Sequence, residues 1–484
     1  MGVYLLLVVG VATALTDAAA ACTAWPACGD GWSLPTTANG WIAFGHRLVA
    51  VAVGVGVLAS SVAVLRAGTR RRVQLAVAVA LFVYPAQAGL GAFVATTGGT
   101  DQTSAIHLLA GVTIFGSLLA ALTWWLEAET GDPDDVPSGP PEPAEPLDPD
   151  SRPPVPTDPV ERTKATLFAY FRLMKPRLMW LLCLVAAAAM ALAGGPGLTP
   201  YTVGATLGGG ALSIGASGTF NHILERDVDR RMARTSDRPL ATDLVPLRNA
   251  VVFGLLLTAV SIGLFATVNL LTAALGVVAV LFYSVIYTLI LKPNTVQNTV
   301  LGGAAGALPA LIGWAAVTGS IGVGGLLLAA FIFWWTPAHF YSLALAYKDD
   351  YERGGFPMLP VVYGETATRR HILWYFGATL VTGAGLAATD TLGWLYVVTA
   401  VGLGAVFLWF VVRLHYEQTE GAAFRSFHAS NAYLGTFCWP SSLRVWCCSR
   451  WPRRPAGSRS PCQPVDGSTG HSLSTANCWL AFSM

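Results

Sequence analysis

Long apolar runs recur along most of the chain and constrain its fold more than any other feature. A helix needs about 20 consecutive apolar residues to cross a bilayer, and hydrophobic residues make up 54% of the 484 positions. This composition excludes a soluble globule and predicts an all-α polytopic membrane protein. Twelve spans are expected, near residues 2–21, 41–65, 73–96, 104–126, 178–194, 201–221, 247–268, 270–291, 299–318, 323–347, 371–388 and 394–413. The first run lacks the basic start of a signal peptide, so we expect it to be retained as a span.

Basic residues cluster between the spans, where they indicate orientation rather than a nucleic-acid partner. Arg66 and the arginines at 70–72 follow the second span and place that loop in the cytoplasm. Counting onward from this loop, residues 221–246 and 348–370 also lie inside. We therefore expect a multi-pass protein of the cell membrane whose loops at 22–40 and 97–103 lie outside.

Residues 127–162 are rich in Pro, Asp and Glu and contain almost no large apolar side chain. Such a segment cannot bury enough surface to fold, so we expect a disordered, extended and solvated cytoplasmic linker. The linker would divide a four-helix transmembrane domain, residues 1–126, from a bundle of eight to nine transmembrane helices, residues 163–437.

An acidic stripe follows the sixth predicted span, in "NHILERDVDRRMARTSDRPL" (221–240). A topogenic loop would explain the arginines, but not Asn221, Glu225 and Asp229. These are spaced i, i+4, i+8 and would share one face of a helix that continues out of the membrane. Oxygen ligands in this arrangement suit Mg²⁺, which commonly bridges protein carboxylates to the phosphates of a substrate.

A second acidic cluster, Asp349 and Asp350, is expected at the same membrane face, in "YKDDYERGGFPMLPVVYG" (347–364). A solvated loop could explain either cluster alone, whereas two clusters at one face are typical of a functional site. We expect both clusters to be catalytic and to act on the same diphosphate. Mg²⁺ would be held by Asn221, Glu225, Asp229 and Asp350. Four basic residues would supply direct positive charge to the diphosphate oxygens: Lys175, Arg234, Arg238 and Lys292.

Residues 164 to about 436 resemble the UbiA-type intramembrane prenyltransferases and, within them, the protoheme IX farnesyltransferase (heme O synthase) family. The family motif Asn-x-x-x-Asp-x-x-x-Asp falls on residues 221–229, with Glu225 where the family usually has Asp. The resemblance rests on "FRLMKPRLM" (171–179), "NHILERDVDRRMARTSDRPL" (221–240), "YTLILKPNTVQN" (287–298), "GGAAGALPALIGWAAVTG" (302–319), "WTPAHFYSLALAYKDDY" (335–351) and "GFPMLPVVYG" (355–364).

The resemblance implies a UbiA-type bundle and a reaction. Members of the family transfer the farnesyl group of farnesyl diphosphate to a vinyl group of protoheme IX, with Mg²⁺ as cofactor, and give heme O for heme A biosynthesis. His339 in "TPAHF" is a candidate haem contact, although a histidine that hydrogen-bonds between helices fits equally well. Two other functions stay open: prenylation of a quinone precursor, and a non-catalytic haem-binding or assembly role.

Two histidines stand out in the first four predicted helices, His46 in "WIAFGHRLVAV" and His107 in "TSAIHLLAGV". Each lies one or two turns from the outer end of its span, as axial ligands to one haem iron would, although either could instead hydrogen-bond a neighbour. Cys22 and Cys28 fall in an outside loop, where a disulfide is compatible with the oxidising environment.

Residues 1–126 resemble one half of a heme A synthase, on "CTAWPACGDGWSLP", "FGHRL", "AQAGLGAFV" and "IHLLAG". The resemblance implies a haem in this domain and a partner, either heme A synthase or a second copy of this chain. That family usually has a carboxylate three positions before the first histidine of its catalytic half, where this chain has Ala43. Haem binding or transfer therefore competes with oxidation of heme O as the role of this domain.

The composition changes abruptly at Cys438. Five of the eight cysteines and four of the sixteen tryptophans lie at or after this residue, among Ser, Pro and Arg. No apolar run of membrane length remains there, although the resemblance implies another helix. We interpret residues 438–484 as an atypical tail read in a shifted frame. A genuine Cys-rich tail is the alternative, but no metal-ligand spacing supports it.

Overall fold

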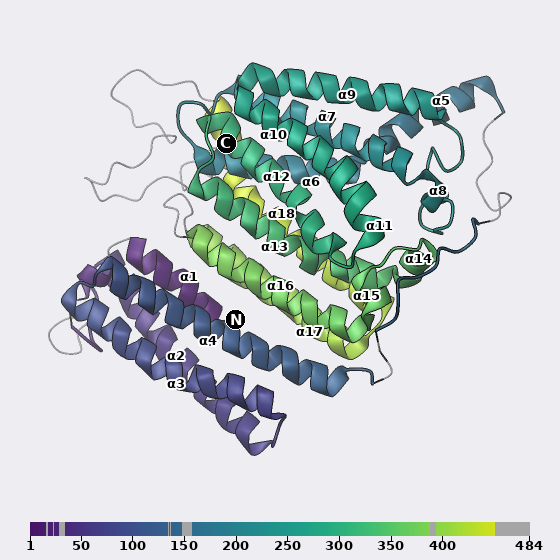
Figure 1. The fold of residues 1–484 in the computed structure, drawn as a ribbon. Helices are drawn as coiled ribbons and strands as arrows, with labels where there is room; N and C mark the ends of the chain where they lie inside the picture. Colours follow the sequence, from purple (N-terminus) through teal and green to yellow (C-terminus); the bar gives the residue numbers. More distant parts are fainter. Residues whose placement is uncertain are drawn as a thin grey trace. The chain divides into compact units, whose positions relative to one another are not determined.

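A computed structural model describes residues 1–15, 18–22, 24–28, 34–133, 135, 137–147, 157–387 and 394–450. The described residues form helices and no strand (Figure 1). The long helices are α1 (Gly2–Leu15), α2 (Ala38–Arg66), α3 (Arg71–Thr97), α4 (Asp101–Thr130), α5 (Pro159–Leu173), α6 (Pro176–Ala193), α7 (Pro200–Leu224), α9 (Leu247–Val268), α10 (Leu270–Leu281), α12 (Asn298–Thr318), α13 (Val323–Ala346), α16 (Gly364–Ala387), α17 (Trp394–Glu417) and α18 (Glu420–Arg450). Shorter elements are η1 (Ala18–Ala21), α8 (Arg226–Asp229), the π-helix η3 (Phe282–Leu291), α11 (Lys292–Asn294), α14 (Lys348–Arg353) and α15 (Leu359–Val362).

The prediction of an all-α polytopic membrane protein is confirmed, but fewer spans qualify than expected. Among the described residues, nine helical segments are long and apolar enough to cross a membrane. Three of the twelve predicted spans are not among them. Helix α1 has only 14 residues, α7 is rich in Gly, Ser and Thr, and α16 carries three charged residues near its start.

The expected linker is shorter than its composition suggested. Helix α4 continues to Thr130 and α5 begins at Pro159, so residues 127–130 and 159–162 are helical rather than disordered. Asp158 caps α5, because its side chain accepts hydrogen bonds from the N–H groups of Val160 and Glu161. Strong local capping explains why a helix begins inside a segment of linker-like composition.

Packing divides the chain into two compact units, and the predicted domain boundaries stay a prediction. The first unit contains residues 1–140, 330–348 and 358–433. Among the described residues, the second contains those within 141–329, together with 349–357 and 434–450. Helix α18 continues to Arg450, past the change of composition at Cys438, and residues 451–484 lie outside the described part.

In the first unit, helices from the start of the chain pack on helices from its end. Trp124 of α4 meets Trp374 of α16 edge to face, with ring centroids 6.3 Å apart. A Cβ atom placed on Gly383 of α16 would lie 3.3 Å from Oη of Tyr4, and one on Gly404 of α17 would lie 3.3 Å from the Met1 side chain. Helices α1 and α4 therefore share a core with α16 and α17.

In the second unit, small residues let α7 approach its neighbours closely. A Cβ atom on Gly209 would lie 2.9 Å from the ring of Phe265 on α9. Ser261 of α9 also donates a hydrogen bond of 2.7 Å to the Gly209 carbonyl. Such close packing through glycine and hydroxyl side chains is typical of helices in membranes, and it fixes the helix that ends at the acidic stripe.

Candidate active site

The acidic stripe lies at a helix break rather than on one continuous helix. Helix α7 ends at Leu224, Glu225 is its C-cap, and Asp229 closes the short helix α8. The N–H of Glu225 still bonds the Asn221 carbonyl at 2.9 Å, and the N–H of Asp229 bonds the Glu225 carbonyl at 2.8 Å. The predicted continuous helix is therefore wrong at Glu225, but the three residues keep helical spacing and all are buried.

Lys175 reaches this stripe from the start of α6. It has a positive φ of 53°, which is uncommon for a residue with a side chain, and Pro176 after it disfavours the right-handed helical region. A Cβ atom on Gly218 would lie 3.2 Å from the Lys175 side chain, so the glycine gives the lysine room beside α7. The Lys175 ammonium donates to Asn221 Oδ1 and, at 3.2 Å, to Tyr283 Oη.

Two buried carboxylates are each matched to a cation. Lys292 Nζ lies 2.6 Å from Glu225 Oε1. Arg238 Nη1 donates to both oxygens of Asp229, at 2.8 and 3.0 Å, and lies 3.8 Å from Glu225 Oε2. With Lys175, three basic side chains surround two carboxylates, an arrangement that suits an anionic ligand.

The surroundings shift the two carboxyl groups in opposite directions. Burial alone would raise the pKa of Glu225, but the charges of Lys292 and Lys175 bring this pKa below its usual value. Burial raises the pKa of Asp229 despite Arg238, and the negative charge of Glu225 adds to the rise. A further cation beside Asp229 would therefore help to keep its carboxylate ionised.

The second acidic cluster makes different contacts from those we expected. Asp350 accepts two backbone hydrogen bonds of 2.9 Å, from the N–H groups of Ala233 and Arg234. Asp349 is exposed. In the described structure Asp350 therefore holds the loop after Asp229 in place, and its predicted role as a Mg²⁺ ligand stays a prediction.

Aromatic side chains that the sequence analysis missed surround the predicted cations. Lys292 Nζ lies 4.3 Å from the ring centre of Phe356, and the Arg234 guanidinium lies 5.0 Å from that of Tyr351. Thr288 of η3 accepts a hydrogen bond of 3.2 Å from the Asn221 amide. Its own hydroxyl donates to the carbonyl five residues earlier, a spacing that belongs to the π-helix and often marks functional sites.

The oxygen atoms at this site fit Mg²⁺. The amide oxygen of Asn221 and the carboxylates of Glu225 and Asp229 are hard ligands, and Mg²⁺ usually adds waters and substrate phosphates to one or two protein carboxylates. Within the described residues, no group of three or more His, Cys, Asp and Glu side chains is close enough to hold a metal. Each of the three oxygen ligands is engaged by Lys175, Lys292 or Arg238.

His339 lies in the first unit, within an aromatic box. Its ring stacks on Trp335 and Phe427 at centroid distances of 4.4 and 4.3 Å. Its Nδ1 lies 2.6 Å from the hydroxyl of Ser430 on α18. This contact fits a histidine that hydrogen-bonds between helices, and the predicted contact with haem stays a prediction.

The two N-terminal histidines both keep a ring nitrogen without a partner. The Nδ1 atoms of His46 and His107 are buried and have no hydrogen-bond partner among the described residues. A Cβ atom on Gly10 would lie 3.4 Å from the His46 ring, and one on Gly91 would lie 3.0 Å from the His107 ring, so a glycine leaves space beside each imidazole.

The loop that precedes α2 is cross-linked. Cys22 and Cys28 form a disulfide. Arg47, which follows His46, donates from Nη2 to the Cys22 carbonyl at 2.8 Å and from Nη1 to the Ala24 carbonyl at 2.7 Å. The loop is therefore attached to the helix that carries the first histidine.

Comparison with known proteins identifies relatives over most of the chain. The sequence profile of the UbiA prenyltransferase family matches residues 181–436, just over half of the chain. The protoheme IX farnesyltransferase of Haloquadratum walsbyi is 63% identical over 441 residues, which cover 90% of this chain and 92% of that protein. The protoheme IX farnesyltransferase of Haloarcula marismortui is 63% identical over 437 residues, which cover 90% and 94%.

Solved structures show a weaker likeness. A UbiA homologue from Archaeoglobus fulgidus bound to DMAPP and Mg²⁺ is 17% identical, with a TM-score of 0.45, and the match covers 57% of this chain and 99% of that one.

Proposed function

The chain belongs to the UbiA prenyltransferase family, and from this we propose that it is a heme O synthase, which transfers the farnesyl group of farnesyl diphosphate to protoheme IX. Identity of 63% with protoheme IX farnesyltransferases over 90% of the chain carries the proposal. The buried cluster of two carboxylates and three basic side chains at the end of α7 supports it, since it suits a diphosphate bound with a metal ion.

The chemistry follows from the charges at this cluster. Mg²⁺, held by Asn221, Glu225, Asp229 and Asp350, would neutralise the diphosphate and favour its departure. Lys292 and Arg238, which balance the carboxylates in the protein alone, would then be free to contact diphosphate oxygens. Lys175 and Arg234 would add further positive charge.

The bond changes need no protein nucleophile. The C–O bond of farnesyl diphosphate breaks, and the diphosphate leaves with the electron pair. A vinyl group of protoheme IX attacks the allylic cation through its π electrons and forms a C–C bond. Water adds to the resulting cation and a proton is lost, which gives the hydroxyethylfarnesyl side chain of heme O. Buried Tyr351 and Phe356 beside the cations would help to exclude water from the first cation.

Haem extraction tests this proposal. Membranes of a host without its own heme O synthase should contain heme O when they contain this chain, and only protoheme when they do not. A prenylated quinone precursor in place of heme O would identify the other acceptor class. Unchanged haems, together with haem bound to the purified chain, would indicate a non-catalytic carrier.

We also propose that the N-terminal helices bind a haem between His46 and His107. The two buried Nδ1 atoms without partners support this, because imidazole nitrogens are axial ligands to haem iron. Ala43 stands where the heme A synthases usually have a carboxylate, so haem binding or transfer is the proposed role, with heme A synthase or a second copy of this chain as the partner.

We also propose an orientation of the chain in the membrane. Basic residues at 66–72 and 348–370 support a cytoplasmic position for the loops at 221–246 and 348–370, with the diphosphate site. Modification of single introduced cysteines by an impermeant thiol reagent, at positions 68 and 98, would test it. Labelling at position 98 alone in intact cells is the expected result.

A further inference from the structure

Residues 132–147, which we expected to form a solvated tether, are bonded to the rest of the protein at regular intervals. Hydrogen bonds occur at every third residue apart from Pro141, which has no N–H group. The bonded residues are Asp132, Asp135, Ser138, Ala144 and Leu147. From Ser138 onward this repeat of three matches a polyproline II helix, which has three residues per turn and presents one face along its length. Asp132 and Asp135 lie instead in a turn closed by a hydrogen bond of 3.3 Å from the Asp135 N–H to the Asp132 carbonyl.

The prolines of this segment follow the same repeat on another face. Pro137, Pro143 and Pro146 each directly precede a bonded residue, and Pro140 precedes Pro141, the position of the repeat that has no hydrogen bond. Proline fixes φ near the polyproline II value and cannot donate a hydrogen bond. The prolines therefore restrict the backbone of the segment, and other residues make its hydrogen bonds. Ala144 and Leu147 are half-buried, whereas Glu142, Pro143, Glu145 and Pro146 are exposed.

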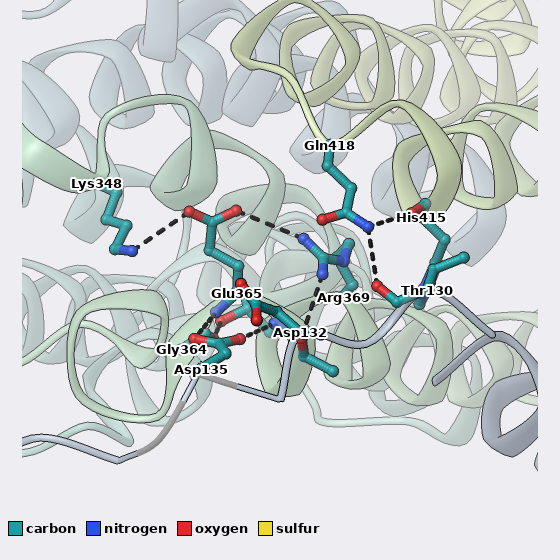
Figure 2. Close-up of polar contacts among 11 residues, drawn as sticks. Thr130, Asp132, Asp135, Lys348, Gly364, Glu365, Arg369, His415 and Gln418 are labelled. Atoms are coloured by element: carbon teal, nitrogen blue, oxygen red, sulfur yellow. Dashed lines mark hydrogen bonds and ion pairs between the residues drawn. The ribbon is translucent and has the colours of Figure 1, made fainter. Parts of the chain in front are cut away.

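In the first unit, the segment caps the start of α16. The carboxylate of Asp135 accepts hydrogen bonds from the N–H groups of Glu365 and Thr366, at 3.1 and 2.6 Å, as Figure 2 shows. This is the contact that an N-cap side chain normally makes from within the same helix. Ser138 donates from its N–H to the Val362 carbonyl at 2.8 Å and from its hydroxyl to the Val361 carbonyl at 2.9 Å.

In the second unit, the segment is bonded to both loops of the diphosphate site. The N–H of Ala144 donates to the Arg353 carbonyl and the N–H of Leu147 donates to the Arg230 carbonyl, each at 2.9 Å. Arg230 directly follows Asp229, and Arg353 lies three residues after Asp350. One stretch of seven residues, 141–147, thus holds the two acidic loops through their backbones.

The two loops are also bonded to each other beside this stretch. Arg353 donates from Nε to the Arg231 carbonyl at 3.3 Å, next to the bonds that Asp350 accepts. Gly355 has a positive φ of 74°, and a Cβ atom there would lie 2.9 Å from Pro143. The loop therefore has the backbone freedom and the space to lie against the linker.

We propose that residues 141–147 form a polyproline II strap that positions the two acidic loops, so that the linker is part of the architecture of the diphosphate site. The strap acts through the backbone of Arg230 and Arg353, and its residues are positioning rather than catalytic residues. The proposal relies on the proposed function only for the identity of the ligand, farnesyl diphosphate.

Proline substitutions can distinguish a strap that positions the two loops from a linker that only connects the two parts of the chain. In the strap variant, Ala144→Pro with Leu147→Pro, both N–H donors are lost while polyproline II conformation is favoured. In the control variant, Glu142→Pro with Glu145→Pro, the same changes fall on exposed residues whose N–H groups make no hydrogen bond to any described residue. A conservative variant, Ala144→Gly with Leu147→Ala, keeps both N–H groups.

Two measurements on the purified full-length chain give the result. In hydrogen exchange, peptides covering 226–240 and 349–357 should exchange faster in the strap variant than in the other two. The KM for farnesyl diphosphate should rise about five- to thirtyfold in the strap variant, since each lost bond is worth about 1 kcal/mol, while kcat changes less. The control and conservative variants should keep the parent KM.

The outcomes are distinguishable. Equal exchange and equal KM in the strap and control variants would overturn the proposal, and so would equal losses in both, because the effect would then not depend on the two donors. If the double variant does not fold, the single Leu147→Pro variant carries the comparison with Glu145→Pro. Exchange rates do not require turnover, so a parent chain that makes no heme O would refute the proposed function and leave the strap testable.

Discussion

Arg238 contacts Asp229 through one nitrogen, Nη1, which donates to both carboxylate oxygens at 2.8 and 3.0 Å. A guanidinium has five N–H groups, so this contact leaves donors for a diphosphate. The Arg238→Lys variant should keep the charge beside Asp229 but lose this planar set of donors. We expect KM for farnesyl diphosphate to rise about tenfold, as measured by initial rates. Arg248→Lys, at an exposed arginine, is the control, and an equal effect there would argue against the contact.

Asp229→Asn should reduce farnesyl transfer more than about a hundredfold at saturating Mg²⁺, because the variant loses a charge proposed for Mg²⁺ and removes the nearer of the two carboxylates beside Arg238. Heme O formation in membranes measures the effect, and the thermal unfolding of the purified protein shows whether the bundle persists. Asp227→Asn is the matched control, since the Asp227 side chain is 71% exposed. Near-normal turnover of Asp229→Asn would exclude a metal role for this carboxylate.

Asp350→Asn should also abolish most transfer, for two reasons that can be separated. The variant loses a charge proposed for Mg²⁺, and an NH₂ group replaces one of the two oxygens that now accept the N–H groups of Ala233 and Arg234, so that one of these donors faces another donor. Hydrogen exchange at residues 231–236 reports the second effect, and the Mg²⁺ dependence of the rate reports the first. Glu352→Gln, at an exposed neighbour, should change neither. A normal rate in Asp350→Asn would contradict both roles.

His46→Ala or His107→Ala should remove a low-spin haem spectrum from the purified protein while heme O formation continues. The reason is that each substitution removes one of the two axial nitrogens proposed for the iron. His371→Ala, on α16, should leave the spectrum unchanged. If the spectrum survives in both N-terminal variants, the ligands lie elsewhere in the chain.

The chain as written should be a weaker enzyme than one with a corrected reading frame after residue 437. The UbiA profile match ends at residue 436, where Arg, Pro and Cys begin to replace apolar residues. Helix α18 continues to Arg450, but charged residues in this part are costly in hydrocarbon. Translation of the gene in the other two frames should give an apolar run of about 20 residues. The absence of such a run, or full heme O production by this chain, would contradict the idea.

The sequence predicted most of the long helices, because hydropathy identifies segments apolar enough to cross a membrane, but it missed α5, which begins inside the expected linker. It also brought Asn221, Glu225 and Asp229 to one site, since i, i+4 spacing survives the break at Glu225. It could not show that Lys292 and Arg238 neutralise these carboxylates, because the partners lie 67 and 9 residues away and depend on tertiary packing.

The linker shows a different limit. Its composition predicted an extended chain, which agrees with a polyproline II segment. Composition alone does not indicate whether such a segment contacts the rest of the protein. The signal that was missed is the spacing of Pro137, Pro140, Pro143 and Pro146, which marks one face and so implies a second face for contacts. The sequence also could not indicate that Asp350 accepts backbone hydrogen bonds from another loop. An acidic residue gives the same sequence pattern whether it binds a metal ion or caps a loop.

The packing of Met1 and Tyr4 beside Gly404 and Gly383 bears on how the protein is made. A ribosome adds about 5–20 residues per second, so the partners of α1 emerge on the order of tens of seconds after it. During that interval the first helices must stay in the bilayer with their inner faces against lipid or an insertion chaperone. Assembly of the first unit is therefore a late event that waits for the last helices, and mutations in α16 or α17 should expose the N-terminal helices to membrane proteases.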